Sequence, residues 1–148
     1  MRINYTMVGT GLTGGTRVLL NIANRLAKRG HEVTITSLGD KGDHDWFSTN
    51  PNFETNYVSS KKYKYLFGGL QKLTGKYVYD QYQIQALSEA VPNCDINVAT
   101  FWKTAFSVYR SDIGEQFYHM QHHEPLFHDE EYRKRNARES YHLPLNKI

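Results

Sequence analysis

The sequence has little of several features that would place a protein in a special class. Its single cysteine, Cys94, excludes an intrachain disulfide and favours a reducing compartment. No run approaches the roughly 18 apolar residues that a membrane-spanning helix needs, and the first residues lack the apolar core of a secretory signal peptide. We therefore expect a cytoplasmic protein that is soluble or, at most, peripheral at the inner face of the membrane.

Charge of one sign is also scarce. The formal net charge is +3, well below that of a basic nucleic-acid-binding arm, so no nucleic-acid partner is expected. A length of 148 residues fits one compact domain, and we predict a single domain over residues 1–148. Tyrosine, by contrast, is abundant. It is typical of surfaces that meet sugars, lipid headgroups or proteins, and it is also common at half-buried structural positions.

The first 36 residues carry the clearest structural pattern. Residues 3–8 alternate as a strand, and a glycine-rich turn follows at 9–15. Apolar residues then recur on one helical face, and Gly30 is placed to end the helix; these residues are Leu19, Ile22, Ala23, Leu26 and Ala27. A second strand at 31–36 completes a βαβ unit, whose strands must be parallel. The sequence therefore predicts an α/β fold, a Rossmann-like parallel sheet with helices on both faces.

The rest of the chain continues this alternation. Strands are expected at 53–58, 95–100 and 117–121, and helices at 79–91, around 104–109 and from about 129 to Pro144. Residues 38–52 form a polar loop, and three glycines break any long helix between 61 and 76. At 145–148 the α/β pattern would begin another strand. We therefore expect this chain to be a piece of a larger protein.

The glycine turn allows three interpretations. Gly9-x-Gly11-x-x-Gly14 formally matches the fingerprint of an NAD-linked dinucleotide domain. However, the helix that follows is long, and the second strand ends at Thr36-Ser37 without the usual acid, since Asp40 comes later. A nucleotide P-loop is excluded because no Gly-Lys-Ser/Thr follows. The glycines also fit a tight turn with no ligand, or an anion site at a helix N-terminus.

Two stretches resemble glycosyltransferase family 4, in its rhamnosyltransferase-like branch. The first runs Gly14-Gly15-Thr16-Arg17-Val18 and continues to Arg29-Gly30-His31-Glu32-Val33, like the opening strand, Gly-Gly loop and helix of that family. The second joins Thr100-Phe101-Trp102-Lys103-Thr104-Ala105 to Gln121-His122-His123-Glu124-Pro125, like the family's fourth and fifth strands with their Gln-x-x-Glu-Pro segment. The resemblance covers both ends of the chain, whereas residues 40–92 contribute nothing to it.

The resemblance implies the N-terminal, acceptor-side half of a two-domain GT-B enzyme. Such enzymes move a sugar from a nucleotide-sugar donor to a glycan or lipid-linked acceptor, here with retention of configuration, without a metal and with the nucleotide-sugar as substrate rather than cofactor. The C-terminal donor-binding domain is missing from this chain and would be supplied in cis or in trans. The chain alone is then expected to be inactive.

The same resemblance assigns roles to individual residues. Gly14, Gly15, Thr16 and Arg17 would face the donor diphosphate or the acceptor, with the Gly14 and Gly15 amides supporting the leaving charge. Trp102, Lys103, Thr104 and Gln121 would lie on the acceptor side. His122, His123 and Glu124 are the candidate catalytic residues, because they follow the fifth strand, where α/β folds place their ligands.

Two other groups of side chains invite a function. Four histidines, His119, His122, His123 and His128, are near one another in sequence, but neighbours on a strand point to opposite faces, and we predict no metal site. The acidic loop at 40–45 lacks the downstream glutamate of a calcium loop. Lysines and tyrosines alternate across residues 57–77, where the alternatives are peripheral membrane contact, single-stranded nucleic acid, or an ordinary exposed segment.

Three further alternatives for the whole chain remain open. An NAD-linked oxidoreductase domain would bind its dinucleotide at the glycine turn. A non-catalytic Rossmann-like module would recognise a glycan or a protein partner. A two-chain glycosyltransferase would keep the chemistry and carry its donor half on a separate polypeptide.

Overall fold

A computed structural model describes residues 1–59 and 77–148. Within them, six parallel strands form one sheet in the order β3-β2-β1-β4-β5-β6. The strands are β1 (Arg2–Met7), β2 (Glu32–Leu38), β3 (Phe53–Val58), β4 (Ile96–Ala99), β5 (Glu115–Tyr118) and β6 (Asn146–Lys147). The helices are α1 (Gly14–Lys28), α3 (Val78–Ala90), α4 (Trp102–Ser111), α5 (Glu131–Ser140) and a short 3-10 helix, η1 (Glu124–Phe127). The predicted Rossmann-like α/β fold is confirmed.

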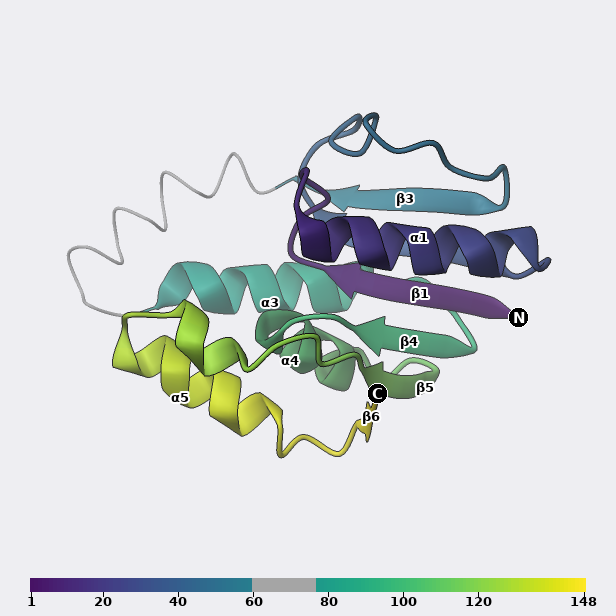
Figure 1. The fold of residues 1–148 in the computed structure, drawn as a ribbon. Coiled ribbons are helices and arrows are strands. Elements are labelled where there is room, and N and C mark those ends of the chain that lie inside the picture. The colour runs from purple at the N-terminus through teal and green to yellow at the C-terminus, as the bar shows by residue number, and fades with distance from the viewer. Residues whose placement is uncertain (60–76) are drawn as a thin grey trace.

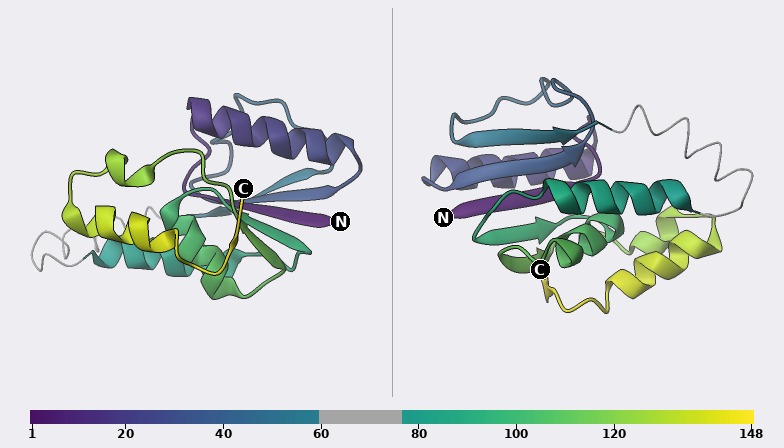
Figure 2. Two further views of the ribbon diagram at one scale, coloured as in Figure 1. Left: turned by 60° about the horizontal axis from the view of Figure 1, so that its bottom comes forward. Right: turned by 180° about the vertical axis from the view of Figure 1, so that it is seen from behind.

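Helices lie on both faces of the sheet. α1 covers one face, and α3 and α4 pack on the other (Figure 1, Figure 2). The N-terminus of α1 is capped by Thr13, whose Oγ1 accepts a hydrogen bond from the Thr16 amide at 3.1 Å. After its last turn Gly30 has a φ of +88°, which glycine adopts without strain, so its predicted role in ending the helix is confirmed.

The two faces of the central strands differ in chemistry. On the α1 side, Ile3, Tyr5 and Met7 of β1 belong to an apolar core. On the other side, Asn4 Nδ2 donates to Asn97 Oδ1 at 2.9 Å, and its Oδ1 accepts from a β2 threonine hydroxyl at 2.8 Å. These polar side chains are completely buried, and burial of polar groups requires such pairing. A side-chain ladder therefore supplements the backbone ladder across β2, β1 and β4.

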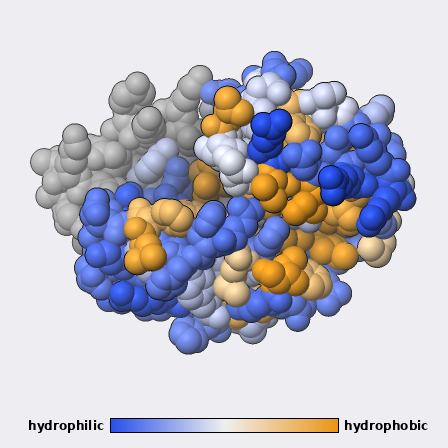
Figure 3. All heavy atoms as spheres, viewed as in Figure 1, coloured by the Kyte–Doolittle hydropathy of each residue, from blue (hydrophilic) through white to orange (hydrophobic). Residues whose placement is uncertain are grey.

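The apolar core on the α1 side continues past the helix. Figure 3 shows hydrophobic side chains gathered along the edge of α1 and over β4 and β5. The partly buried side chains that pack against this core include Ile22 and Leu26 of α1, Ile96 of β4 and Phe117 of β5. Among the described helices, none has the length and hydrophobicity needed to cross a bilayer.

The structure corrects several predicted boundaries. The last helix ends at Ser140 rather than close to Pro144. The fifth strand ends at Tyr118 rather than at 121, because the chain turns away toward Pro125 and η1. The helix expected at 104–109 is longer, and begins at Trp102. The strand at 53–58 is confirmed with the predicted bounds, and the helix at 79–91 is confirmed to within one residue. Residues 60–76 lie outside the described part of the chain, and so does most of the basic and aromatic stretch at 57–77.

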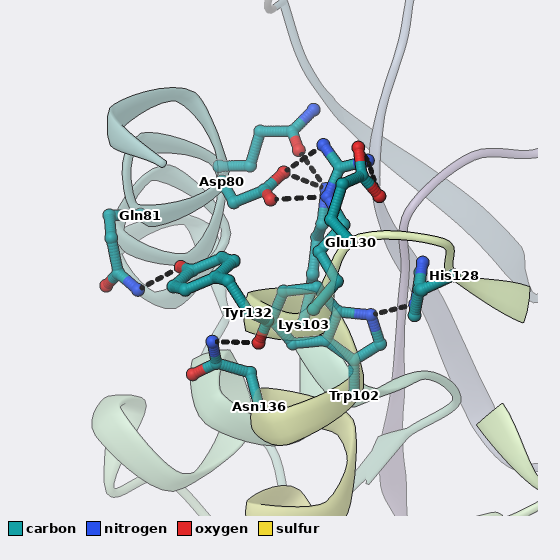
Figure 4. Close-up of polar contacts among 10 residues, drawn as sticks. Asp80, Gln81, Trp102, Lys103, His128, Glu130, Tyr132 and Asn136 are labelled. Atoms are coloured by element: carbon teal, nitrogen blue, oxygen red, sulfur yellow. Dashed lines mark hydrogen bonds and ion pairs between the residues drawn. The ribbon is translucent and has the colours of Figure 1, made fainter. Parts of the chain in front are cut away.

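An ion cluster ties together the helices on the α4 side (Figure 4). Asp80 of α3 is completely buried, and its carboxylate lies 2.5 Å from Lys103 Nζ of α4 and 2.9 Å from Arg133 Nε of α5. Lys103 also donates to Gln83 Oε1 at 2.7 Å. Burial lowers the pKa of the Lys103 ammonium, and the Asp80 carboxylate opposes that change. One carboxylate thus balances cations from two other helices.

We expect Asp80→Asn to destabilise the fold strongly. Removing the carboxylate leaves the largely buried Lys103 ammonium without a carboxylate partner among the described residues, whereas Arg133 keeps its 3.2 Å pair with Glu130. The free energy of unfolding should therefore fall by about 3 kcal/mol. The matched control is Asp95→Asn, whose partner Arg2 forms a 2.8 Å pair with both side chains more than two-fifths exposed. That substitution should cost far less, because water and salt screen an exposed ion pair. Urea unfolding of both variants measures the difference, and equal losses would refute a special role for the buried cluster.

Candidate ligand-binding crevice

The strand order reverses at β1, and a crevice opens where it does. The chain leaves β1 for α1 on one face and leaves the neighbouring β4 for α4 on the opposite face. In open α/β sheets, ligands bind at the carboxyl ends of strands at such a switch point. A cavity of about 320 Å³ lies there. It is lined by residues of three segments, namely the end of β1 with its glycine loop and α1, Thr100 and Phe101 after β4, and Gln121 and His122 after β5.

The glycine loop presents open backbone donors to this crevice. The first turn of a helix has amide groups without intrahelical acceptors, and they carry the positive end of the helix dipole. The Thr16 amide is satisfied by the Thr13 side chain, whereas the Gly14 and Gly15 amides precede it in that turn. The loop is therefore suited to bind an anion or a polar oxygen.

The side chain of Gln121, in the segment after β5, lies against Gly15 at the start of α1. Its Oε1 lies 3.0 Å from where a Cβ on Gly15 would be, so the absence of a side chain at residue 15 lets the amide approach the helix. Its Nε2 atom is the one buried side-chain nitrogen or oxygen without a hydrogen-bond partner in the described residues. Buried polar groups are normally paired. Gln121, a lining residue of the crevice, therefore has an unused side-chain donor and lies against the first turn of α1.

The two candidate histidines lie in different surroundings. His122 lines the crevice, and its exposed ring meets the edge of Phe127 at a centroid distance of 5.3 Å. His123 instead lies against Tyr141, with ring centroids 6.4 Å apart, and is not among the lining residues. Because β5 ends before them, the alternation of strand side chains does not govern their directions. No group of three potential metal ligands occurs within residues 1–59 and 77–148.

Glu124 is buried and does not line the crevice. It is 2% exposed and accepts hydrogen bonds from the Trp102 amide at 2.6 Å and from Tyr118 Oη at 2.7 Å. Its own amide donates to Tyr141 Oη at 2.8 Å. Burial raises the pKa of the Glu124 carboxyl to about 7, although both donors favour the charged form. Glu124 thus joins the segment after β5 to the first turn of α4.

The three predicted acceptor-side residues of α4 are also structural in their contacts. Trp102 is completely buried, and its Nε1 donates to His128 Nε2 at 2.8 Å. Lys103 points into the ion cluster around Asp80 (Figure 4). Thr104 caps the helix, since its Oγ1 accepts the amides of Thr100 and Phe101, each at 2.9 Å. None of these three residues lines the crevice.

The structure therefore brings together only part of the predicted site. Gly15, Thr16, Gln121 and His122 line one crevice, and Gly14 begins the adjoining helix. Arg17 lies on the other side of α1, in a second cavity with Trp46. Thr100 and Phe101 are lining residues that the sequence prediction did not assign a role. Their position just after β4 could have identified them from the sequence, because ligand sites form at the carboxyl ends of strands.

We expect Gly15→Ala to disturb Gln121 while leaving the fold intact. Neither Gly14 nor Gly15 has a positive φ, and alanine favours helix by up to about 1 kcal/mol, so the melting temperature should hold or rise. Only the new methyl group at residue 15 meets Gln121, so only this variant should shift the Gln121 side-chain amide resonances. Gly14→Ala, whose Cβ would have open space, is the control. Equal spectra for the two variants would contradict the contact.

We expect Glu124 to make stability fall as pH rises from about 4.5 to about 7. Its pKa is raised on folding, so its contribution is complete below the unfolded pKa and is lost as pH rises through the folded value. The shift corresponds to about 3 kcal/mol. Glu124→Gln resembles the protonated carboxyl and can donate to Tyr118 Oη, which can in turn donate to Ser140 Oγ, 3.3 Å away.

Denaturant unfolding of both proteins between pH 4.5 and 8 measures this dependence. The free energies of unfolding should be similar near pH 4.5, and Glu124→Gln should be the more stable protein at pH 8. A wild-type slope that the substitution leaves unchanged would show that other groups cause the pH dependence.

Comparison with known proteins yields no family for this chain. The sequence matches no protein-family model and no curated protein. The chemistry of the crevice is therefore the basis on which its function is inferred.

Proposed function

We propose that this chain is the acceptor-side domain of a two-domain GT-B glycosyltransferase of the family 4 type. Such an enzyme transfers a sugar from a nucleotide-sugar to a glycan or lipid-linked acceptor, with retention of configuration. One observation carries the proposal: Gln121, whose Nε2 has no hydrogen-bond partner in the described residues, lies against Gly15 at the start of α1, and both residues line the crevice at the strand switch point. Both stretches that resemble the family contribute residues to its lining.

The donors in the crevice suit the charge that develops in such a transfer. As the bond between sugar and diphosphate breaks, negative charge grows on the leaving phosphate. Amide groups at the positive end of a helix stabilise that charge without reorganising, provided that they are already in place. In this proposal the amides of Gly14 and Gly15 donate to the diphosphate, and Gln121 donates to an oxygen of the phosphate or of a sugar.

The remaining candidates take different parts in the proposal. His122, at the exposed rim, contacts the acceptor or the transferred sugar. Glu124 is a positioning residue, because both of its oxygens are engaged and its side chain is buried. Four other candidates do not line the crevice and hold the surrounding structure through the contacts described above: His123, Trp102, Lys103 and Thr104. The donor-binding half is supplied in cis or by a second polypeptide.

The reaction is assigned to the cytoplasm, and peripheral membrane contact through residues 57–77 stays a prediction. An NAD-linked domain is the rival that shares the glycine loop. In that case, an acid at the end of the second strand would bind the adenosine ribose. Here β2 ends at Ser37 and Leu38, and Trp46 lies against the loop with its Nε1 donating to Thr10 O at 3.0 Å. This arrangement favours the glycosyltransferase proposal.

Titration of the isotope-labelled chain with UDP, GDP, dTDP and NAD tests the proposal by NMR. We expect a nucleoside diphosphate to shift the Gly15 and Thr16 amides and the Gln121 side-chain amide, with a dissociation constant of about 1 mM. The affinity is weak because the nucleoside itself would be held by the other half. Gln121→Met, which keeps the volume and removes the donor, should weaken binding about tenfold, since hydrogen bonds to charged groups contribute about 1.5 kcal/mol or more.

Gln85→Met is the matched control, because Gln85 is exposed on α3 and bonds to Glu89. It should bind like the wild type. Tighter binding of NAD than of every nucleoside diphosphate would favour the oxidoreductase alternative. A crevice that responds to none of the four probes at about 10 mM would favour a non-catalytic module. Transfer itself is then assayed with the native gene product, whose intact mass, compared with 17.2 kDa, tells whether the donor half is in cis.

A further inference from the structure

A second cavity adjoins the glycine loop on the other side of α1. It measures about 450 Å³, within the range of small-molecule sites. One wall comes from the loop and the first turns of α1, and the other comes from the segment between β2 and β3. The lining residues are Leu12, Arg17, Asn21, Trp46, Phe47 and Ser48. None of the functions assigned above uses this cavity.

The aromatic wall is held in place before any ligand arrives. Trp46 Nε1 donates to Thr10 O at 3.0 Å, and the Trp46 and Phe47 rings meet edge to face with centroids 5.7 Å apart. Asn24 of α1 anchors the same segment, since its Oδ1 accepts the Asn50 amide at 2.7 Å and its Nδ2 donates to Ser48 O at 3.4 Å. Pre-organised walls reduce the entropy lost on binding.

The polar groups of the cavity are of two kinds. Arg17 is exposed, and its guanidinium pairs with no side chain in the described residues. A free guanidinium recognises a phosphate or a carboxylate through two parallel hydrogen bonds. Asn21 Nδ2 is engaged with Arg17 O at 2.8 Å, which orients the amide of Asn21 and leaves its Oδ1 for a hydroxyl donor.

We infer that this cavity binds a sugar that carries an anionic group, either a phosphate or a carboxylate. The apolar face of the sugar ring packs on Trp46 and Phe47, its anionic group binds Arg17, and a ring hydroxyl donates to Asn21. Leu12 belongs to the glycine loop, whose Gly9 and Thr13 line the crevice, so the same loop borders both cavities. The role of this site as an acceptor subsite rests on the proposed function, whereas binding of the sugar does not.

The two tryptophans provide a direct readout. Trp46 lines the cavity, and Trp102 is completely buried elsewhere, so the Trp102 indole serves as an internal control. The labelled chain is titrated with glucose 6-phosphate, glucuronate, glucose and inorganic phosphate while both indole resonances are followed. Glucose 6-phosphate or glucuronate should shift Trp46 saturably and leave Trp102 unchanged, and each should bind at least tenfold more tightly than either glucose or inorganic phosphate.

Two substitutions on α1 test the guanidinium. Arg17→Gln should weaken binding of the anionic sugar about tenfold and make it resemble that of glucose. Arg25→Gln, an exposed arginine of the same helix outside the cavity, should leave the affinity unchanged. Equal weakening by both variants would overturn the inference, because it would indicate a general charge effect.

The outcomes separate this inference from the proposed function. No saturable shift of Trp46 with any sugar probe overturns the inference, and equal binding of inorganic phosphate reduces the cavity to an anion site and overturns it as well. A Trp46 response to anionic sugars together with a crevice that ignores every nucleoside diphosphate supports the sugar site and rejects the glycosyltransferase proposal. A crevice response without a Trp46 response does the reverse.

Discussion

The reversal of strand order at β1 is the constraint on which the candidate site depends. Successive strands add on one side of β1 up to β3, and β4 then pairs with the other side, so the connections from β1 and β4 must leave toward opposite faces. Side chains of one connection therefore cannot fill the space above the other. The crevice follows from this topology, and the glycine loop, the segment after β4 and the segment after β5 meet there because their strands are neighbours.

The hydrogen bonds of Glu124 fix the segment after β5 against β5 and α4. The chain after β5 has no regular structure until η1, and a buried carboxyl group in it must find donors. It finds one in the first turn of α4, at Trp102, and one in β5, at Tyr118. Gln121 lies between the end of β5 and Glu124. Both ends of its segment are therefore fixed, and its side-chain amide is held over Gly15. Glu124, a candidate catalytic residue by its position in the sequence, is in the structure a buried side chain that holds its neighbours in place.

The sequence allowed the fold to be predicted where the information was local. The periodicity of α1, the glycine after it and the alternation in β1 each depend on residues a few positions apart, and the structure agrees with them. The end of β5 was wrong by three residues, because the bonds that draw the chain away are made to distant elements. Lys103 shows the same limit: no sequence pattern indicates that a residue on α3 would neutralise it. Pairing across helices is decided by packing, which a motif does not contain.

Side chains from the segment after β2 and from β3 contact the glycine loop on the side toward which a dinucleotide would extend. In a dinucleotide domain, the ligand runs from the loop to the end of the second strand, where an acid binds the ribose. In this chain the segment after β2 folds back over α1, and Trp46 donates to a carbonyl of the loop itself. Tyr57 Oη bonds to Thr10 Oγ1 at 2.8 Å and thereby ties β3 to the loop as well. Under the proposed function, a ligand at the α1 N-terminus would therefore extend toward the crevice, where Gln121 lies, and away from the end of β2. The same contacts that restrict a dinucleotide build the wall of the second cavity, so one loop separates two sites that a sugar-transferring domain would use together.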